Sequence, residues 1–166
     1  TDPFYTLDLT NPKTPKVRGE LKITGYSGYL HPIEENLILG IGQEATEEGI
    51  TTGTKAALYD VENLDDPKVV TTWSPGSGRS SAEWDHHAFL WWAPEKIAVL
   101  PFVDWMNDKA EAVMLKIERG DLEEFGRIAH SAPGSPSGEK SEFIIPIERS
   151  LIVGGEIWTY SRGQLQ

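Results

Sequence analysis

The fold is decided by the stretch Tyr29-Leu-His-Pro-Ile-Glu-Glu-Asn-Leu-Ile-Leu-Gly-Ile-Gly42, which continues through a polar loop to Lys55-Ala-Ala-Leu-Tyr-Asp-Val61 and Asp66-Pro-Lys-Val-Val70. Each piece is a short run of β-branched, aromatic and other apolar residues, and turn residues such as Gly, Asn, Asp and Pro bound it. This pattern is typical of β-strands joined by tight turns. The stretch therefore predicts a unit of four antiparallel strands.

Parts of this unit recur along the chain. The segment Leu7–Val17 aligns without gaps on Tyr59–Val69, so that Asp8 matches Asp60 at an offset of 52 residues (60 − 8). A degenerate third copy is Leu115–Phe125. A second element with one internal spacing also recurs, from Tyr29 to Leu37, from Phe89 to Ile97 and from Phe143 to Leu151.

Repeats of roughly 50 residues that hold several strands each are typical of the blades of a β-propeller. One blade has two apolar faces and buries them only by stacking on its neighbours. With the strands of a blade lettered a to d from the axis outward, the chain reads c-d, abcd, abcd, abc. The predicted fold class is all-β: about three blades plus partial ones, each a four-stranded antiparallel sheet. Residues 1–166 are predicted to form a single β-propeller segment, a fragment of a larger propeller.

The predicted strands and the loops between them follow from the same pattern. The strands are Phe4–Leu9, Lys16–Ile23, Tyr29–Ile33, Leu37–Gly42, Lys55–Val61, Lys68–Trp73, His87–Trp92, Ile97–Phe102, Ala112–Glu118, Glu124–His130, Glu142–Ile147, Leu151–Gly155 and Ile157–Ser161. The loops at one end of the blades, which we expect to form the binding surface, are 43–54, 74–86, 103–109 and 131–141.

Composition narrows the classes of function. The net charge of −11 argues against nucleic acid as a partner, because the phosphate backbone needs a basic surface. Cys is absent, which excludes disulfides and thiolate metal sites. No apolar run approaches the length of a membrane span, so membrane insertion is not expected.

Several runs together resemble a known family. They include Gly25-Tyr-Ser-Gly-Tyr-Leu-His-Pro32, Leu37-Ile-Leu-Gly-Ile-Gly42 and Trp84-Asp-His-His-Ala-Phe-Leu90. With the repeated Asp-Pro-Lys turns, they resemble bacterial and archaeal secreted proteins with a C-terminal β-propeller distantly related to WD40 repeats. The resemblance implies a propeller, a secreted or cell-surface setting and a longer parent chain. It implies no activity, so it assigns no functional residues.

The densest polar and aromatic cluster is Glu83-Trp-Asp-His-His87, which makes Trp84, Asp85, His86 and His87 candidate binding residues. Imidazoles and carboxylates are good ligands for divalent metals. On the predicted strand, however, adjacent side chains face opposite ways, so one metal ion could not easily bind both histidines. The alternative is that one histidine forms a hydrogen bond within the blade while the other lies near the axis.

A second candidate is the loop that holds Asp104 and Trp105. An exposed Trp beside carboxylates is a common arrangement for binding sugars, whereas the favoured alternative places this Trp in the gap between blades. Asp8 and Asp60, at the ends of c strands, are expected to cap the turns that follow them. Carboxylates also suit calcium, which makes this pair a candidate metal site and calcium the cofactor to consider. Glu44 is expected to lie in a solvated acidic loop.

The function favoured by the sequence is that of a non-enzymatic extracellular or cell-surface propeller module for binding or scaffolding. Its partner is a protein or a carbohydrate, and open blade edges predict self-association. One alternative is a hydrolase or lyase that acts on polysaccharides, which rests on analogy with other propellers alone. Another alternative is a calcium-stabilised structural module.

Overall fold

The computed structural model describes residues 3–118, 120–130 and 145–166. These residues form thirteen β-strands and three short 3-10 helices, which confirms the all-β class. They divide into two compact units, Thr1–Gly76 and Ser77–Gln166, and each unit is described by itself. In the described part of the chain, no helix has the length and apolar character needed to cross a membrane. The single segment over residues 1–166 stays a prediction.

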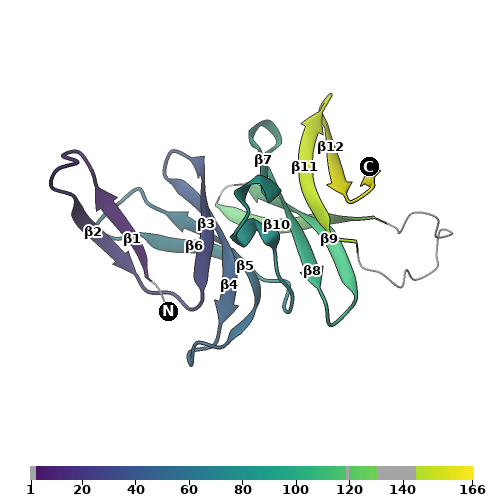
Figure 1. The fold of residues 1–166 in the computed structure, drawn as a ribbon. Helices are drawn as coiled ribbons and strands as arrows, with labels where there is room; N and C mark the ends of the chain where they lie inside the picture. Colours follow the sequence, from purple (N-terminus) through teal and green to yellow (C-terminus); the bar gives the residue numbers. More distant parts are fainter. Residues whose placement is uncertain (1–2, 119, 131–144) are drawn as a thin grey trace. The chain divides into compact units, whose positions relative to one another are not determined.

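The first unit contains the four-stranded sheet that the sequence predicts (Figure 1). Its strands are β3 (Tyr26–Glu34), β4 (Leu37–Ala45), β5 (Thr51–Asp60) and β6 (Lys68–Trp73), antiparallel and hydrogen-bonded in that order. The central strands β4 and β5 supply the fully buried core side chains Leu39, Ile41, Leu58 and Tyr59. Both strands extend further into the segment 43–54 than predicted, because residues expected in that loop belong to β4 and β5.

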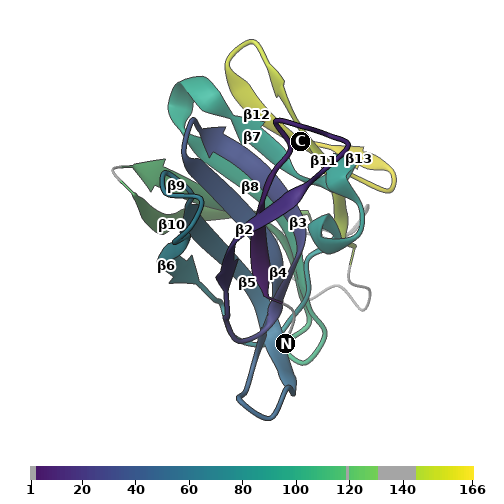
Figure 2. The ribbon, with the colours of Figure 1, turned by 90° about the vertical axis from the view of Figure 1, so that its left-hand side faces the viewer.

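A hairpin of β1 (Phe4–Asp8) and β2 (Lys16–Leu21) packs on one face of this sheet. The ring of Phe4 stacks on the ring of Tyr59 with centroids 4.5 Å apart. The hydroxyl of Thr6 donates to a backbone carbonyl of the β5–β6 loop at 2.5 Å. Figure 2, viewed from the side of the hairpin, shows β1 and β2 in front of the sheet.

The repeat of 52 residues is reproduced in the register of the two hairpins. Leu7 lies opposite Val17 in the β1–β2 pair, and Tyr59 lies opposite Val69 in the β5–β6 pair. In each pair the register shifts just before this position, so the same irregularity occurs twice. The hairpin β1–β2 is therefore a second copy of the outer half of the four-stranded sheet.

The second unit contains two sheets and three 3-10 helices (Figure 1). The first sheet has the order β10-β9-β8-β7. Its strands are β7 (Leu90–Trp92), β8 (Ile97–Asp104), β9 (Lys109–Glu118) and β10 (Asp121–Ala129). The other sheet is formed by β11 (Ile147–Val153), β12 (Glu156–Ser161) and β13 (Gln164–Leu165). The helices are η1 (Ser81–Glu83), η2 (His86–Ala88) and η3 (Ala93–Glu95).

Apolar packing and one histidine join the two sheets of the second unit. Ile97 and Val99 of β8 form a buried cluster with Ile147 of β11. His130, just after β10, contacts two buried hydroxyls of β12 through its two ring nitrogens, at 2.5 Å and 2.7 Å. Blade-to-blade stacking of this kind buries faces that a single sheet would leave in water.

Two predicted strands are wrong in position. The strand expected at His87–Trp92 begins only at Leu90, because the carboxylate of Asp85 accepts a hydrogen bond from the His87 amide at 3.1 Å and caps η2. Such local side-chain bonds compete with strand pairing. A turn was also expected before Leu151, but β11 runs through it.

The hairpin turn lies instead at Gly154 and Gly155, whose φ angles of 61° and 83° favour glycine. Leu151 therefore lies inside β11 rather than at the start of a second strand. The prediction that it is the equivalent of Leu37 and Ile97, each of which begins a strand, is wrong. The predicted loop 131–141 and residue Phe143 lie outside the described residues, as do the first residues of the predicted strand Glu142–Ile147.

Candidate binding surface

The loop between β8 and β9 is held in one shape by the carboxylate of Asp104, which is buried. One oxygen accepts hydrogen bonds from the backbone amides of Met106 at 3.1 Å and Asn107 at 3.3 Å. The other oxygen accepts from the Asn107 side chain at 2.6 Å and from the Ser77 hydroxyl at 3.0 Å. This aspartate therefore fixes the turn that follows it, as Asp commonly does.

The turn presents two large apolar side chains to solvent. Trp105 is 63% exposed and Met106 is 85% exposed. The interpretation of Trp105 as a filler between blades is therefore wrong. Because Asp104 holds the backbone, these side chains are displayed on a pre-organised support, which lowers the entropy lost when a partner binds.

The same hydrogen bonds affect the titration of Asp104. The bond from Asn107 contributes most to lowering the pKa of Asp104 below its ordinary value of 3.8, burial opposes it, and the bonds from Ser77 and the turn amides add to it. The ionised carboxylate therefore stabilises the loop, and this contribution is fully present above the ordinary value. It is lost as the pH falls through the lowered pKa.

We expect acid to loosen this loop at a pH below the ordinary aspartate range. The amide resonance of Met106 should shift with a midpoint below 3.8, because its hydrogen bond depends on the ionised carboxylate. An NMR titration measures this midpoint. The Asp104→Asn variant should show no such transition, and a midpoint above the ordinary value would contradict the arrangement.

The other predicted cluster surrounds η2. Trp84, His86 and His87 are exposed, and the two histidine rings lie side by side with centroids 4.0 Å apart. The expectation that these histidines face opposite ways is wrong, because they occupy a 3-10 turn rather than a strand. Asp85 caps that turn and pairs with Arg149 of β11 at 2.9 Å, so its carboxylate has a structural role.

The repeated aspartates cap turns, as expected. Asp8 accepts a hydrogen bond from the backbone amide of Thr10 at 2.9 Å, and Asp60 accepts one from the amide of Glu62 at 2.8 Å. Among residues 3–118, 120–130 and 145–166, no three His, Asp or Glu side chains are gathered as a metal site would require. Calcium binding stays a prediction.

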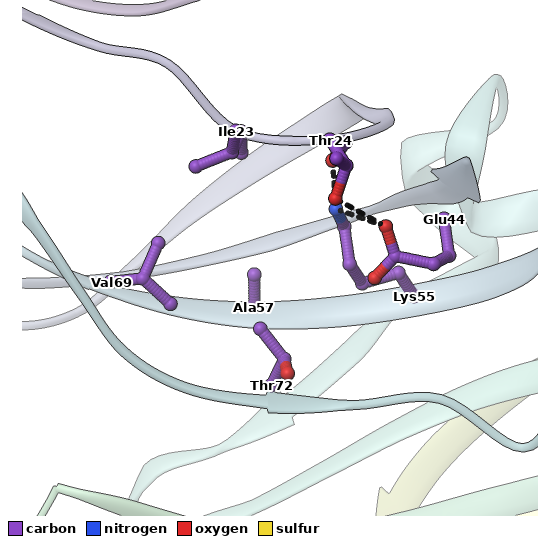
Figure 3. A pocket seen from close by; sticks show the side chains of 7 residues that line it. All are labelled: Ile23, Thr24, Glu44, Lys55, Ala57, Val69 and Thr72. Carbon is purple, nitrogen blue, oxygen red and sulfur yellow. Dashed lines mark hydrogen bonds and ion pairs between the residues drawn. The ribbon is translucent and has the colours of Figure 1, made fainter. Parts of the chain in front are cut away.

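A pocket of about 300 Å³ lies in the first unit, between the segment after β2 and the sheet (Figure 3). Figure 3 shows Ile23 and Thr24 on one side and Ala57 and Thr72 on the other. The residues that line it are Ile23, Thr24, Glu44, Lys55, Ala57, Val69 and Thr72. One cation, one anion, two hydroxyls and three apolar side chains thus share a single cavity.

The polar side of this pocket is built on Lys55, which is only 3% exposed. Its Nζ donates to the carbonyl oxygen of Thr24 and to the carboxylate of Glu44, the latter at 3.3 Å. Burial raises the pKa of Glu44, but bonds from Ala45 and Thr24 and the charge of Lys55 outweigh it, so the pKa is lowered overall. Glu44 is therefore part of an ion pair, and the solvated loop predicted for it is wrong.

The sequence contains one signal of this pair, although Lys55 is not among the predicted site residues. Lys55 begins the apolar run Lys55-Ala-Ala-Leu-Tyr59, and a lysine is seldom fully buried unless it is paired. The pair ties the linker after β2 to the sheet, which makes stability its first role. A bound ligand in this pocket would have to compete with bonds that Lys55 already makes.

A family model described as a beta propeller domain matches residues 1–166. An uncharacterized protein of Methanocaldococcus jannaschii is 42% identical over 123 residues, which cover 74% of this chain and 18% of that protein. An uncharacterized protein of Archaeoglobus fulgidus is 45% identical over 101 residues, which cover 61% of this chain and 15% of that protein. The chain thus spans less than a fifth of the length of these relatives.

Proposed function

Because this chain belongs to the beta propeller domain family, we propose that it is a non-enzymatic binding module that recognises a protein through the loop of Trp105 and Met106. The proposal rests on one observation: this loop exposes two large apolar side chains while hydrogen bonds hold its backbone in place. Two large apolar side chains point into solvent, and four hydrogen bonds to Asp104 fix the turn that bears them. Rigid aromatic anchors of this kind dominate the affinity of many protein interfaces.

The chemistry of the loop favours a protein over a carbohydrate. A sugar site pairs an aromatic face with free polar groups, whereas both oxygens of Asp104 are engaged within the loop. Methionine and tryptophan are enriched at protein interfaces, and the flexible thioether of Met106 adapts to an irregular apolar surface. A secreted or cell-surface setting is part of the proposal and rests on the family resemblance of Gly25–Pro32.

A random peptide display library tests the proposal on the intact chain. Peptides enriched on the wild-type protein should lose affinity by at least about tenfold against Trp105→Ala, because truncating an aromatic anchor removes most of the apolar contact. Biolayer interferometry with the enriched synthetic peptides measures the change. Because Trp105 is exposed, the variant should fold with an unchanged melting temperature.

Phe125→Ala is the matched control, since Phe125 is also an exposed aromatic residue but lies on β10, outside the loop. Its peptide affinities should equal those of the wild type. Enrichment that ignores Trp105, or no enrichment at all, would contradict the proposal. A glycan array on which the wild type binds sugars through Trp105 would move the proposal to a carbohydrate partner and would reject the protein partner.

A further inference from the structure

The pocket of the first unit, drawn in Figure 3, contains an acceptor that its own hydrogen bonds do not use. One carboxylate oxygen of Glu44 accepts from the Thr24 hydroxyl at 2.9 Å and from the Ala45 amide at 3.0 Å. The same oxygen accepts from Lys55 Nζ at 3.3 Å. The described part of the chain supplies no partner for the other oxygen of Glu44. That oxygen is therefore open to a ligand.

Lys55 has one donor left as well. An ammonium group carries three N–H donors, and Lys55 uses two of them, on the carbonyl of Thr24 and on Glu44. Its Nζ makes no third hydrogen bond to any residue that the structure describes. Because this side chain is almost fully buried, a donor without a partner costs free energy. A ligand that brings an acceptor to Lys55 is favoured for this reason.

The shape of the pocket suits a small molecule. Its floor is formed by the buried residues Lys55 and Ala57 of β5, and its rim includes the exposed residues Val69 and Thr72 of β6. Every lining residue lies between positions 23 and 72, and the structure describes that whole range. The volume of about 300 Å³ is at the lower end of the range of ligand pockets. A ligand of a few heavy atoms with a short apolar part therefore fits this site.

The paired charges restrict the class of ligand. Lys55 attracts an anionic ligand but Glu44 repels it, and a cationic ligand meets the reverse. A ligand that takes part of Lys55 also weakens the bond of Lys55 to Glu44, unless it offers Glu44 a cation in return. A zwitterion meets both requirements, because its carboxylate accepts from the lysine while its ammonium donates to the glutamate. Hydrogen bonds between charged groups are stronger than those that a neutral ligand would form.

We propose that this pocket binds a free amino acid with a small apolar side chain. The ammonium group of the ligand donates to the unused oxygen of Glu44, and its carboxylate accepts from the third donor of Lys55. Its side chain packs against Ile23 and Val69, which line the same cavity. The pocket and the loop of Trp105 share no residue, so the proposal goes beyond the proposed function.

Isothermal titration calorimetry of the intact chain with L-valine tests the proposal, and we expect saturable binding. N-acetyl-L-valine lacks the ammonium charge and L-valinamide lacks the carboxylate, so each should bind at least about tenfold more weakly. Glycine lacks the apolar side chain and should also lose about tenfold in affinity. Equal affinity for either blocked derivative would overturn the assignment to a zwitterion. Absence of saturable binding by L-valine would overturn the proposal as a whole.

Two variants place the ligand in this pocket. Val69→Phe fills the cavity from its rim and should weaken L-valine binding by at least about tenfold. Val17→Phe is the matched control, because Val17 is the repeat equivalent of Val69 and is also exposed but does not line the pocket. It should bind L-valine as the wild type does. Equal affinities of the two variants would overturn the location.

Glu44→Gln tests the contact with the ammonium group. The change keeps the size of the side chain and removes its charge, so L-valine should lose its advantage over N-acetyl-L-valine. A variant that keeps the full advantage, or that weakens both ligands alike, would overturn this contact. Trp105→Ala should bind L-valine with the wild-type affinity, so this proposal and the proposed function can fail separately.

Discussion

Tyr59→Ala is expected to lower the free energy of unfolding by about 3–5 kcal/mol. The ring of Tyr59 is fully buried in the sheet of the first unit and stacks on Phe4. Its hydroxyl lies 3.0 Å from the hydroxyl of Ser27. Removing the ring leaves a cavity between the hairpin and the sheet and leaves Ser27 without this partner. Denaturation of the intact chain with urea, followed by tryptophan fluorescence, measures the loss.

Two substitutions make this result interpretable. Tyr59→Phe keeps the ring and removes one hydrogen bond, so it should cost about 1 kcal/mol. Leu7→Ala changes the equivalent residue of the repeat, and because Leu7 is half-exposed the cost should stay below about 1 kcal/mol. Equal costs for Tyr59→Ala and Leu7→Ala would contradict the burial that separates these two positions.

The second large effect is expected from Gly42→Ala in β4. A Cβ at this position would lie 2.0 Å from the carbonyl oxygen of Tyr26 on the neighbouring strand. Because the contact is with backbone, the pair β3–β4 must separate, and we expect a loss of about 3 kcal/mol. The same denaturation experiment measures it.

Gly49→Ala is the matched control for Gly42→Ala. Gly49 has a φ of 84° and no heavy atom within 4 Å of an added Cβ, so only backbone strain opposes the change. The expected cost is about 1 kcal/mol. A larger loss at Gly49 than at Gly42 would show that β3 and β4 do not approach as closely as described.

The repeat could be predicted from sequence because it depends on side chains that form hydrogen bonds within their own turns. Asp8 and Asp60 cap their turns through the same hydrogen bond, and their neighbours follow at equal spacing. The strands His87–Trp92 and Leu151–Gly155 could not be placed correctly. In the first, Asp85 caps a 3-10 turn over the start of the predicted strand, and in the second β11 continues through Leu151 to a turn at Gly154 and Gly155.

The candidate site was predictable in position but not in the roles of its residues. The loop of Asp104 and Trp105 is where the sequence placed it, yet the aspartate faces inward and the tryptophan outward. The bond from Lys55 to the carbonyl of Thr24 joins residues 31 positions apart. Such contacts depend on how the linker after β2 crosses the sheet, and no local pattern encodes that path.

The central claim is that β1–β2 repeats the outer half of the four-stranded sheet and lies against its face. NMR measures this most directly, through contacts between the ring protons of Phe4 and Tyr59 and between Leu7 and Val17. The rings lie 4.5 Å apart and the second pair faces across the hairpin, so both sets of nuclear Overhauser effects should be strong. A spectrum with the Leu7–Val17 contact but none between Phe4 and Tyr59 would show a hairpin detached from the sheet and would contradict the account.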